Sequence, residues 1–136
     1  MDNELTISGK NMITLATGTD LSTLLRPLSR EIPLFDSYVA GTGYINDPSI
    51  LDALKVGDTL TLRREPENRF DENAILVLDG KEQKIGYIPE RDNTVFARLM
   101  DARLMDAGKF LTARIVRLEE KGSFRQINIS IFLVDF

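Results

Sequence analysis

The chain has 136 residues, of which 43% are hydrophobic and 28% charged, a profile typical of one globular domain. It contains no cysteine and no histidine, which excludes disulfides and Ser–His or Cys–His catalytic pairs and argues against a zinc site. Its net charge of −4 disfavours broad binding to duplex DNA, but it leaves room for a small site for one strand end. We therefore expect neither a metal nor a cofactor.

The beginning of the chain carries no targeting pattern. No apolar run approaches the ~20 residues of a transmembrane helix. The first residues, MDNELTISGK, lack the basic and apolar regions of a secretory signal. We expect a cytoplasmic protein without a membrane contact. Residues 1–31 are predicted to be an N-terminal extension, either packed onto the main domain or partly disordered, and residues 32–136 to form that domain.

From Ile32 onward the chain alternates strand and turn patterns. The stretch LFDSYVAGTGYI predicts a strand followed by a glycine-rich turn. Asp47 is placed to cap a short helix with Pro48 at its first position. A strand follows in which Leu60 and Leu62 share one face.

The second half of the domain predicts two hairpins around a helix. The first hairpin turns at Asp79 and Gly80. The helix is expected to be capped by Asp92 or Asn93 and to end at Gly108. The second hairpin turns at KGS, and four apolar residues share one face of its last strand: Ile127, Ile129, Ile131 and Leu133. The fold class is therefore predicted as mainly β, a small closed or nearly closed barrel with two or three short α-helices.

The pentapeptide ARLMD occurs twice in tandem, at residues 97–101 and 102–106. Five residues of α-helix turn the second copy by about 140° relative to the first. The two copies therefore cannot face a core in the same way, and we interpret them as a short duplication. The alternative is coincidence within a helix that is rich in good helix formers.

The stretch RFDENAI, residues 69–75, places a ring beside an acid in a loop. One interpretation is a capped turn, in which Asp71 accepts hydrogen bonds from nearby backbone N–H groups and Phe70 packs into the core. The other is a binding site, in which Phe70 stacks on a base with a carboxylate at its side. The residues alone leave both open.

Other segments offer weaker candidates for a binding site. Gly41 and Gly43 flank a turn that presents Tyr44 as a second ring, and Tyr87 alternates with apolar residues after the first hairpin. Arg91 stands near a predicted helix start, where an anion is favoured.

Two further patterns are ambiguous. Arg114 lies in a segment with a local excess of basic residues, which indicates either a solvated sheet face or a groove that follows a nucleic-acid backbone. Asp71 with Glu82 and Lys84 matches the Asp…Glu-x-Lys order of metal-dependent nucleases. However, Glu82 and Lys84 stand at the mouth of the predicted hairpin, where polar residues are expected in any case.

These pieces, in this order, resemble the HIRAN domain. The resemblance runs from about Ile32 to about Val116 and on toward the C-terminus, and REPENRFDENAI is its most specific element. The stretch that begins KIGYIPERDN fits the family only when one copy of ARLMD is left out. At two positions the chain differs from end-binding members of the family. Gly43 stands where they carry an arginine, and Glu90 stands near the place of a lysine.

The resemblance implies an OB-like or SH3-like β-barrel that binds the 3′-hydroxyl end of single-stranded DNA without catalysis. It implies a role in DNA repair or at replication forks, with a helicase or nuclease as partner protein. The family's aromatic–aspartate pair falls on Phe70 and Asp71, and its other rings fall on Tyr44 and Tyr87. The full set of expected DNA contacts is Tyr44, Arg69, Phe70, Asp71, Tyr87, Arg91 and Arg114. The alternatives are a protein-interaction barrel with a vestigial pocket, or a divalent-metal nuclease.

Overall fold

Six strands form one sheet in the computed structural model, which describes residues 30–102, 109–122 and 124–135. Their order across the sheet is β1-β6-β5-β2-β3-β4. The bounds are β1 Arg30–Tyr38, β2 Thr59–Arg64, β3 Ile75–Leu78, β4 Lys84–Tyr87, β5 Lys109–Lys121 and β6 Phe124–Asp135. The mainly β class is confirmed, and residues Glu31–Asp135 form one compact unit.

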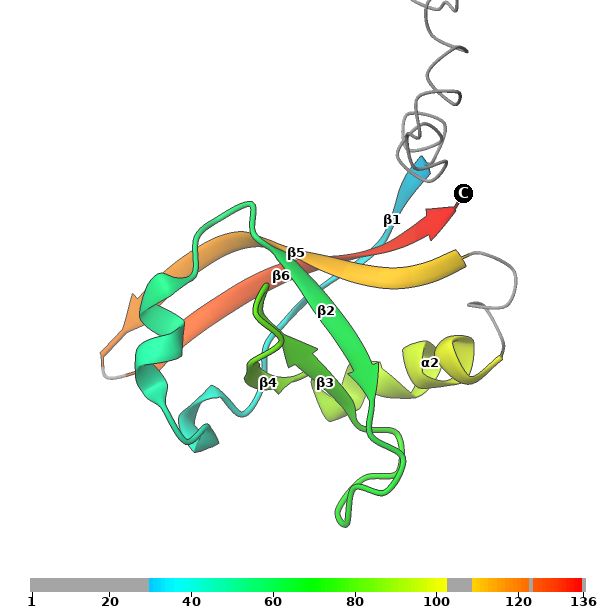
Figure 1. The fold of residues 1–136 in the computed structure, drawn as a ribbon, viewed down its shortest axis with the longest axis horizontal. Coiled ribbons are helices and arrows are strands. Elements are labelled where there is room, and N and C mark those ends of the chain that lie inside the picture. The colour runs from blue at the N-terminus through cyan, green and yellow to red at the C-terminus, as the bar shows by residue number, and fades with distance from the viewer. Residues whose placement is uncertain (1–29, 103–108, 123, 136) are drawn as a thin grey trace, which may run out of the picture. The chain divides into compact units, whose positions relative to one another are not determined.

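The β5–β6 hairpin is the long element of the sheet, and the shorter β2, β3 and β4 lie across it (Figure 1). Ile127, Ile129 and Ile131 are fully buried in the core, as their alternation predicts. A register shift between Ile115 and Arg117 marks a bulge in β5. Strands this long twist, and a bulge adds local twist and bend, which helps the hairpin wrap around the core.

The meander β2–β3–β4 completes the core. Leu60 and Leu62 of β2 are buried while their neighbours in the strand are more exposed, which confirms the predicted alternation. The β3–β4 hairpin is also confirmed, although its connection is wider than a two-residue Asp-Gly turn. Asp79 holds that connection together because its carboxylate accepts hydrogen bonds from the N–H groups of Lys81 and Gln83.

The sheet is not closed into a barrel, so the expected closed or nearly closed barrel is only roughly matched. One isolated bridge, Ala40 to Tyr87, joins the chain just after β1 to the edge strand β4. The backbone then turns away at Gly41, whose φ of 74° is left-handed. The pairing stops there, because a chain that turns at Gly41 cannot continue a ladder along β4.

The helical segments of the described residues differ in type from the short α-helices predicted. Within the described residues α2, Glu90–Asp101, is α-helical, whereas η3, Thr42–Tyr44, and η4, Pro48–Ala53, are 3-10 helices. Short connections favour 3-10 hydrogen bonds, which close after three residues. The predicted cap of η4 is confirmed, since the hydroxyl and the N–H of Ser49 both donate to Asp47 and lower the pKa of its carboxyl.

The predicted cap of α2 is wrong. The helix begins at Glu90 after Pro89, and Asp92 and Asn93 lie inside its first turn. Their side chains make contacts between elements instead, because Asp92 accepts a hydrogen bond from Ser37 and Asn93 donates to Asp71. The first ARLMD copy lies in α2. Most of the second copy, and the predicted helix end at Gly108, lie outside the described residues.

No helix among the described residues is both long enough and apolar enough to cross a membrane.

Gly86 of β4 keeps the single bridge between the sheet edges tight. A Cβ atom there would lie 2.4 Å from the carbonyl oxygen of Ala40 and 2.5 Å from Cγ1 of Val39. The Ala40 carbonyl accepts the Tyr87 N–H in the bridge, and the Val39 side chain is buried in the core, so Gly86→Ala is expected to lower the free energy of unfolding by about 1–3 kcal/mol. Urea unfolding measures this change. Gly80→Ala, in the same hairpin but with nothing within 4 Å of its Cβ, is the control and is expected to unfold like the parent.

Candidate functional site

The loop between β2 and β3 is closed at its base by hydrogen bonds from two residues. The N–H of Glu65 donates to the carbonyl of Ala74 at 3.0 Å. The Arg64 guanidinium donates to the carbonyls of Ala74 and Glu72 and also pairs with Asp101 of α2. These bonds tie the loop to both its strands and to the helix, so its tip has a fixed base.

Asn68 organises the tip of this loop. Its Oδ1 accepts hydrogen bonds from the N–H groups of Phe70 at 2.9 Å and Asp71 at 3.0 Å, and its Nδ2 donates to Glu65 at 2.7 Å. The backbone conformation that results directs the Phe70 ring outward, where it is 93% exposed. The interpretation in which Phe70 packs into the core is therefore wrong.

Asp71 is held through both of its carboxylate oxygens. Oδ1 accepts the N–H of Asn73 at 2.9 Å, and Oδ2 accepts Nδ2 of Asn93 at 2.7 Å. The first contact confirms that Asp71 caps its own turn. An ionised carboxylate has about four acceptor positions, so two occupied positions leave capacity for a further donor.

Tyr87 of β4 is fixed by a polar chain. Its hydroxyl donates to Glu65 Oε1 at 2.8 Å and accepts from Lys84 Nζ at 3.2 Å, and that ammonium lies 4.5 Å from the ring centroid. The pKa of Glu65 is lowered by hydrogen bonds from Asn68 first and then from Tyr87. Glu65 is therefore ionised at neutral pH and holds both the ring of Tyr87 and the turn at Asn68 in place.

A cavity of about 250 Å³ opens between these groups. The residues that line it include Phe70, Tyr87 and Asp71, together with Ala40 and Gly41.

The charge of this cavity is negative. Asp71 and Glu90 are the charged side chains among the described residues that line it, and no lysine or arginine joins them. The cavity thus combines apolar surface with hydrogen-bond acceptors. It suits an uncharged group that carries a donor better than it suits an anion.

Tyr44 lies beside this cavity rather than in it. It is 90% exposed at the end of η3 and lines a separate hollow together with Lys84. Lys84 lines this hollow and also bonds to Tyr87, which lines the cavity, so the Lys84 side chain lies between the hollow of Tyr44 and the cavity. The structure therefore places Phe70, Asp71 and Tyr87 together, with Tyr44 adjacent.

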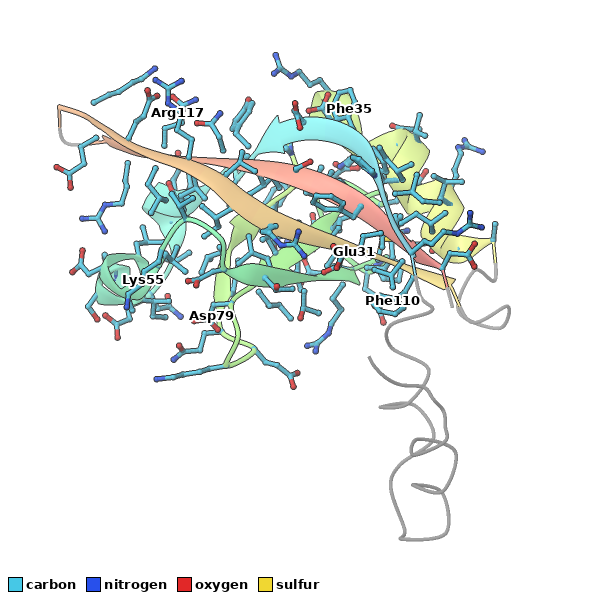
Figure 2. The ribbon with its side chains drawn as sticks, turned by 90° about the horizontal axis from the view of Figure 1, so that it is seen from above. Glu31, Phe35, Lys55, Asp79, Phe110 and Arg117 are labelled. Atoms are coloured by element: carbon cyan, nitrogen blue, oxygen red, sulfur yellow. The ribbon has the colours of Figure 1, made fainter. Side chains whose placement is uncertain are left out.

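The three predicted arginines differ in position. Arg69 is exposed next to Phe70. Arg91 lies over the ring of Tyr38, with 5.3 Å between the guanidinium carbon and the ring centroid. Arg114 is not brought into the site, because it pairs with Glu31 and stacks on Phe132. Figure 2 labels Glu31 over the sheet, where it reaches β5.

The geometry gives no support to the nuclease alternative. Glu82 is engaged by Arg63 at 2.8 Å, while Asp71 is engaged by Asn73 and Asn93. Within residues 30–102, 109–122 and 124–135, no group of three or more acids, histidines or cysteines could hold a metal ion.

Comparison with known families matches residues 32–134 to the HIRAN domain. The chain belongs to the HIRAN domain family. The expected resemblance is thereby confirmed, and it extends close to the C-terminus. Membership of the HIRAN family supports a nucleic-acid-binding module in general, and HIRAN domains are typically binding modules rather than catalysts.

Two solved structures share the fold. A protein from Lactobacillus plantarum is 28% identical, with a TM-score of 0.68 over 79% of this chain and 99% of that chain. The HIRAN domain of human HLTF has a TM-score of 0.60 at 16% identity, over 77% of this chain and 79% of that chain, which shows the fold alone. No curated protein matches this HIRAN chain.

Four residues of the site were missed as functional candidates: Glu65, Asn68, Lys84 as a partner of Tyr87, and Asn93. The first two belong to the REPENRFDENAI stretch, so their place in the most specific HIRAN element was an available signal. Asn93 was interpreted as a helix cap, and no local pattern indicates its contact with Asp71, which is distant in sequence.

Proposed function

We propose that this HIRAN domain captures the 3′-hydroxyl end of single-stranded DNA without catalysing a reaction. The observation that carries the proposal is the 93% exposed ring of Phe70 beside the anchored carboxylate of Asp71. A large exposed ring on a rigid loop is a platform on which a base of any sequence can stack. A carboxylate next to it is an acceptor for a hydroxyl donor.

The two groups divide the recognition of a strand end between them. Phe70 and Tyr44 hold the last base or bases, and Asp71 receives the terminal hydroxyl. Tyr87, Arg69 and Arg91 steer the phosphates that follow, with Lys84 as an additional cation close to Tyr87. Such a module acts in DNA repair or replication-fork processing beside a helicase or nuclease, as the family resemblance implies.

A titration that compares linear and circular single strands of one sequence tests the proposal. The circular strand offers the same bases and phosphates but no end, so the linear strand is expected to bind at least roughly tenfold more tightly, about 1.4 kcal/mol. Equal affinity would show that the protein does not recognise ends. Failure to bind either strand would favour the protein-interaction alternative.

Binding is expected to depend only weakly on salt. The cavity has acidic rather than basic lining, so the protein contacts about two or three phosphates. With a slope of about −0.7 per phosphate for single strands, the log–log plot of affinity against salt should fall with a slope between about −1.5 and −2. A titration series from low to high salt measures it. A slope steeper than about −4 would indicate a basic groove that this proposal does not include.

A further inference from the structure

Asn93 is a buried polar residue in the first turn of α2, and only one of its two side-chain amide atoms has a hydrogen-bond partner. It is 2% exposed, and its Nδ2 donates to Oδ2 of Asp71 at 2.7 Å. Its Oδ1 is buried without a hydrogen-bond partner. The amide cannot be turned round, because Oδ1 would then face the carboxylate oxygen of Asp71, and both are acceptors.

This arrangement is unfavourable for stability taken by itself. A buried acceptor without a partner loses its hydration and gains no bond in return. An apolar side chain of similar size at this place in α2 would avoid that loss. The hydrogen bond to Asp71 is the contact that Asn93 provides in exchange, and it connects the helix to the candidate site.

The contact fixes the orientation of the Asp71 carboxylate relative to the cavity. Asn73 holds one carboxylate oxygen and Asn93 holds the other, so the plane of the carboxylate is fixed from two sides. No lysine or arginine lines the cavity among the described residues, so no cation occupies the remaining acceptor positions. Those positions stay available for a donor on the ligand.

We infer that Asn93 is a positioning residue that gives the site its selectivity for a terminal hydroxyl over a terminal phosphate. Asn93 also lines the cavity, but it is only 2% exposed, so it acts through its hydrogen bond to Asp71 rather than by holding the strand itself. The inference rests on the proposed function, and it assigns the selectivity to a pair of residues on different elements, the β2–β3 loop and α2.

The test uses the full chain with Asn93→Leu, which keeps the size of the side chain and removes both polar atoms. Affinities for two strands that differ only in a 3′-hydroxyl or a 3′-phosphate are measured for each protein. The parent is expected to bind the 3′-hydroxyl strand at least roughly tenfold more tightly than the 3′-phosphate strand. For Asn93→Leu the same ratio is expected to fall to about threefold or less, while its melting temperature is equal to or higher than that of the parent. Thr94→Ala, an exposed change one position along α2, is the control and should keep the parent's preference.

A combined variant separates positioning from a general structural role. In the Asp71→Asn background, Asn93→Leu is expected to change neither affinity by more than about twofold, because Asn93 acts only through the carboxylate. The inference is wrong if Asn93→Leu keeps the parent's preference for the hydroxyl strand. It is also wrong if Asn93→Leu lowers the affinity for both strands equally in either background. Should the leucine variant not fold, Asn93→Ala is read in the same way. A parent that binds both strands equally would refute the proposed function itself, before any variant is made.

Discussion

Asp71→Asn is expected to reduce the preference for a 3′-hydroxyl over a 3′-phosphate from at least roughly tenfold to about twofold. An ionised carboxylate accepts hydrogen bonds and cannot donate them, so it matches a hydroxyl donor and repels a phosphate. Its bond to the hydroxyl is charge-assisted and therefore stronger than the bond an amide could make. Asparagine removes the charge and adds two donors that a phosphate can use.

The surroundings of Asp71 strengthen this contrast. Glu90 is the other charged side chain among the described residues that line the cavity, so no cation in that lining offsets the repulsion between Asp71 and a terminal phosphate. A base stacked on Phe70 would reduce access of water to Asp71, and electrostatic contrast rises as water is excluded. Equilibrium titrations with the two strands measure the preference directly.

Glu72→Gln is the matched control for Asp71→Asn. It removes the same charge from the next residue of the loop, but Glu72 is exposed and does not line the cavity. We expect it to keep the parent's preference within about twofold. If Glu72→Gln and Asp71→Asn reduce the preference equally, the effect is one of net charge, and Asp71 is not the group that reads the end.

Phe70→Ala is expected to weaken binding of single strands by about 1–3 kcal/mol, or roughly 5–150-fold, as the loss of one stacking platform does. The ring is 93% exposed, so its removal takes little buried surface from the fold. The hydrogen bond from the Phe70 N–H to Asn68 is made by the backbone and is retained. The melting temperature should therefore stay close to that of the parent while the affinity falls.

Two other substitutions at this position show which property of the ring matters. Phe70→Tyr keeps the aromatic face, so its affinity for single strands is expected to lie within about threefold of the parent's. Phe70→Leu keeps an apolar side chain without an aromatic face, so its affinity is expected to fall as far as that of Phe70→Ala. Full affinity in a folded Phe70→Ala protein would rule out stacking at this residue.

The strands could be predicted because their signals are local. Leu60 and Leu62 alternate with polar neighbours, and Ile127, Ile129 and Ile131 do the same in β6. The order of the strands is not a local property. For this reason the placement of Arg114 against Glu31, on a distant part of the chain, could not be read from its alternation in β5.

The site could be predicted only where its signals are local. The stretch RFDENAI allows Phe70 to point inward or outward, and the choice is made by Asn68, whose amide bonds to the Phe70 and Asp71 N–H groups and to Glu65. Asn93 has the side chain of a good helix cap, but the helix begins before it and its amide instead bonds across to the loop. The Asn68 contacts span two or three residues, so they lie within the local pattern, whereas the Asn93 contact joins residues 22 apart in the sequence and no local pattern indicates it.

The central claim is that the unmodified protein recognises a free 3′-hydroxyl. A competition titration tests it most directly, with a labelled single strand displaced by unlabelled strands of one sequence that end in a 3′-hydroxyl or a 3′-phosphate. We predict that the hydroxyl strand displaces the label at a concentration at least roughly tenfold lower than the phosphate strand. Displacement by both strands at the same concentration would contradict the account, because Asp71 would then have no part in reading the strand end.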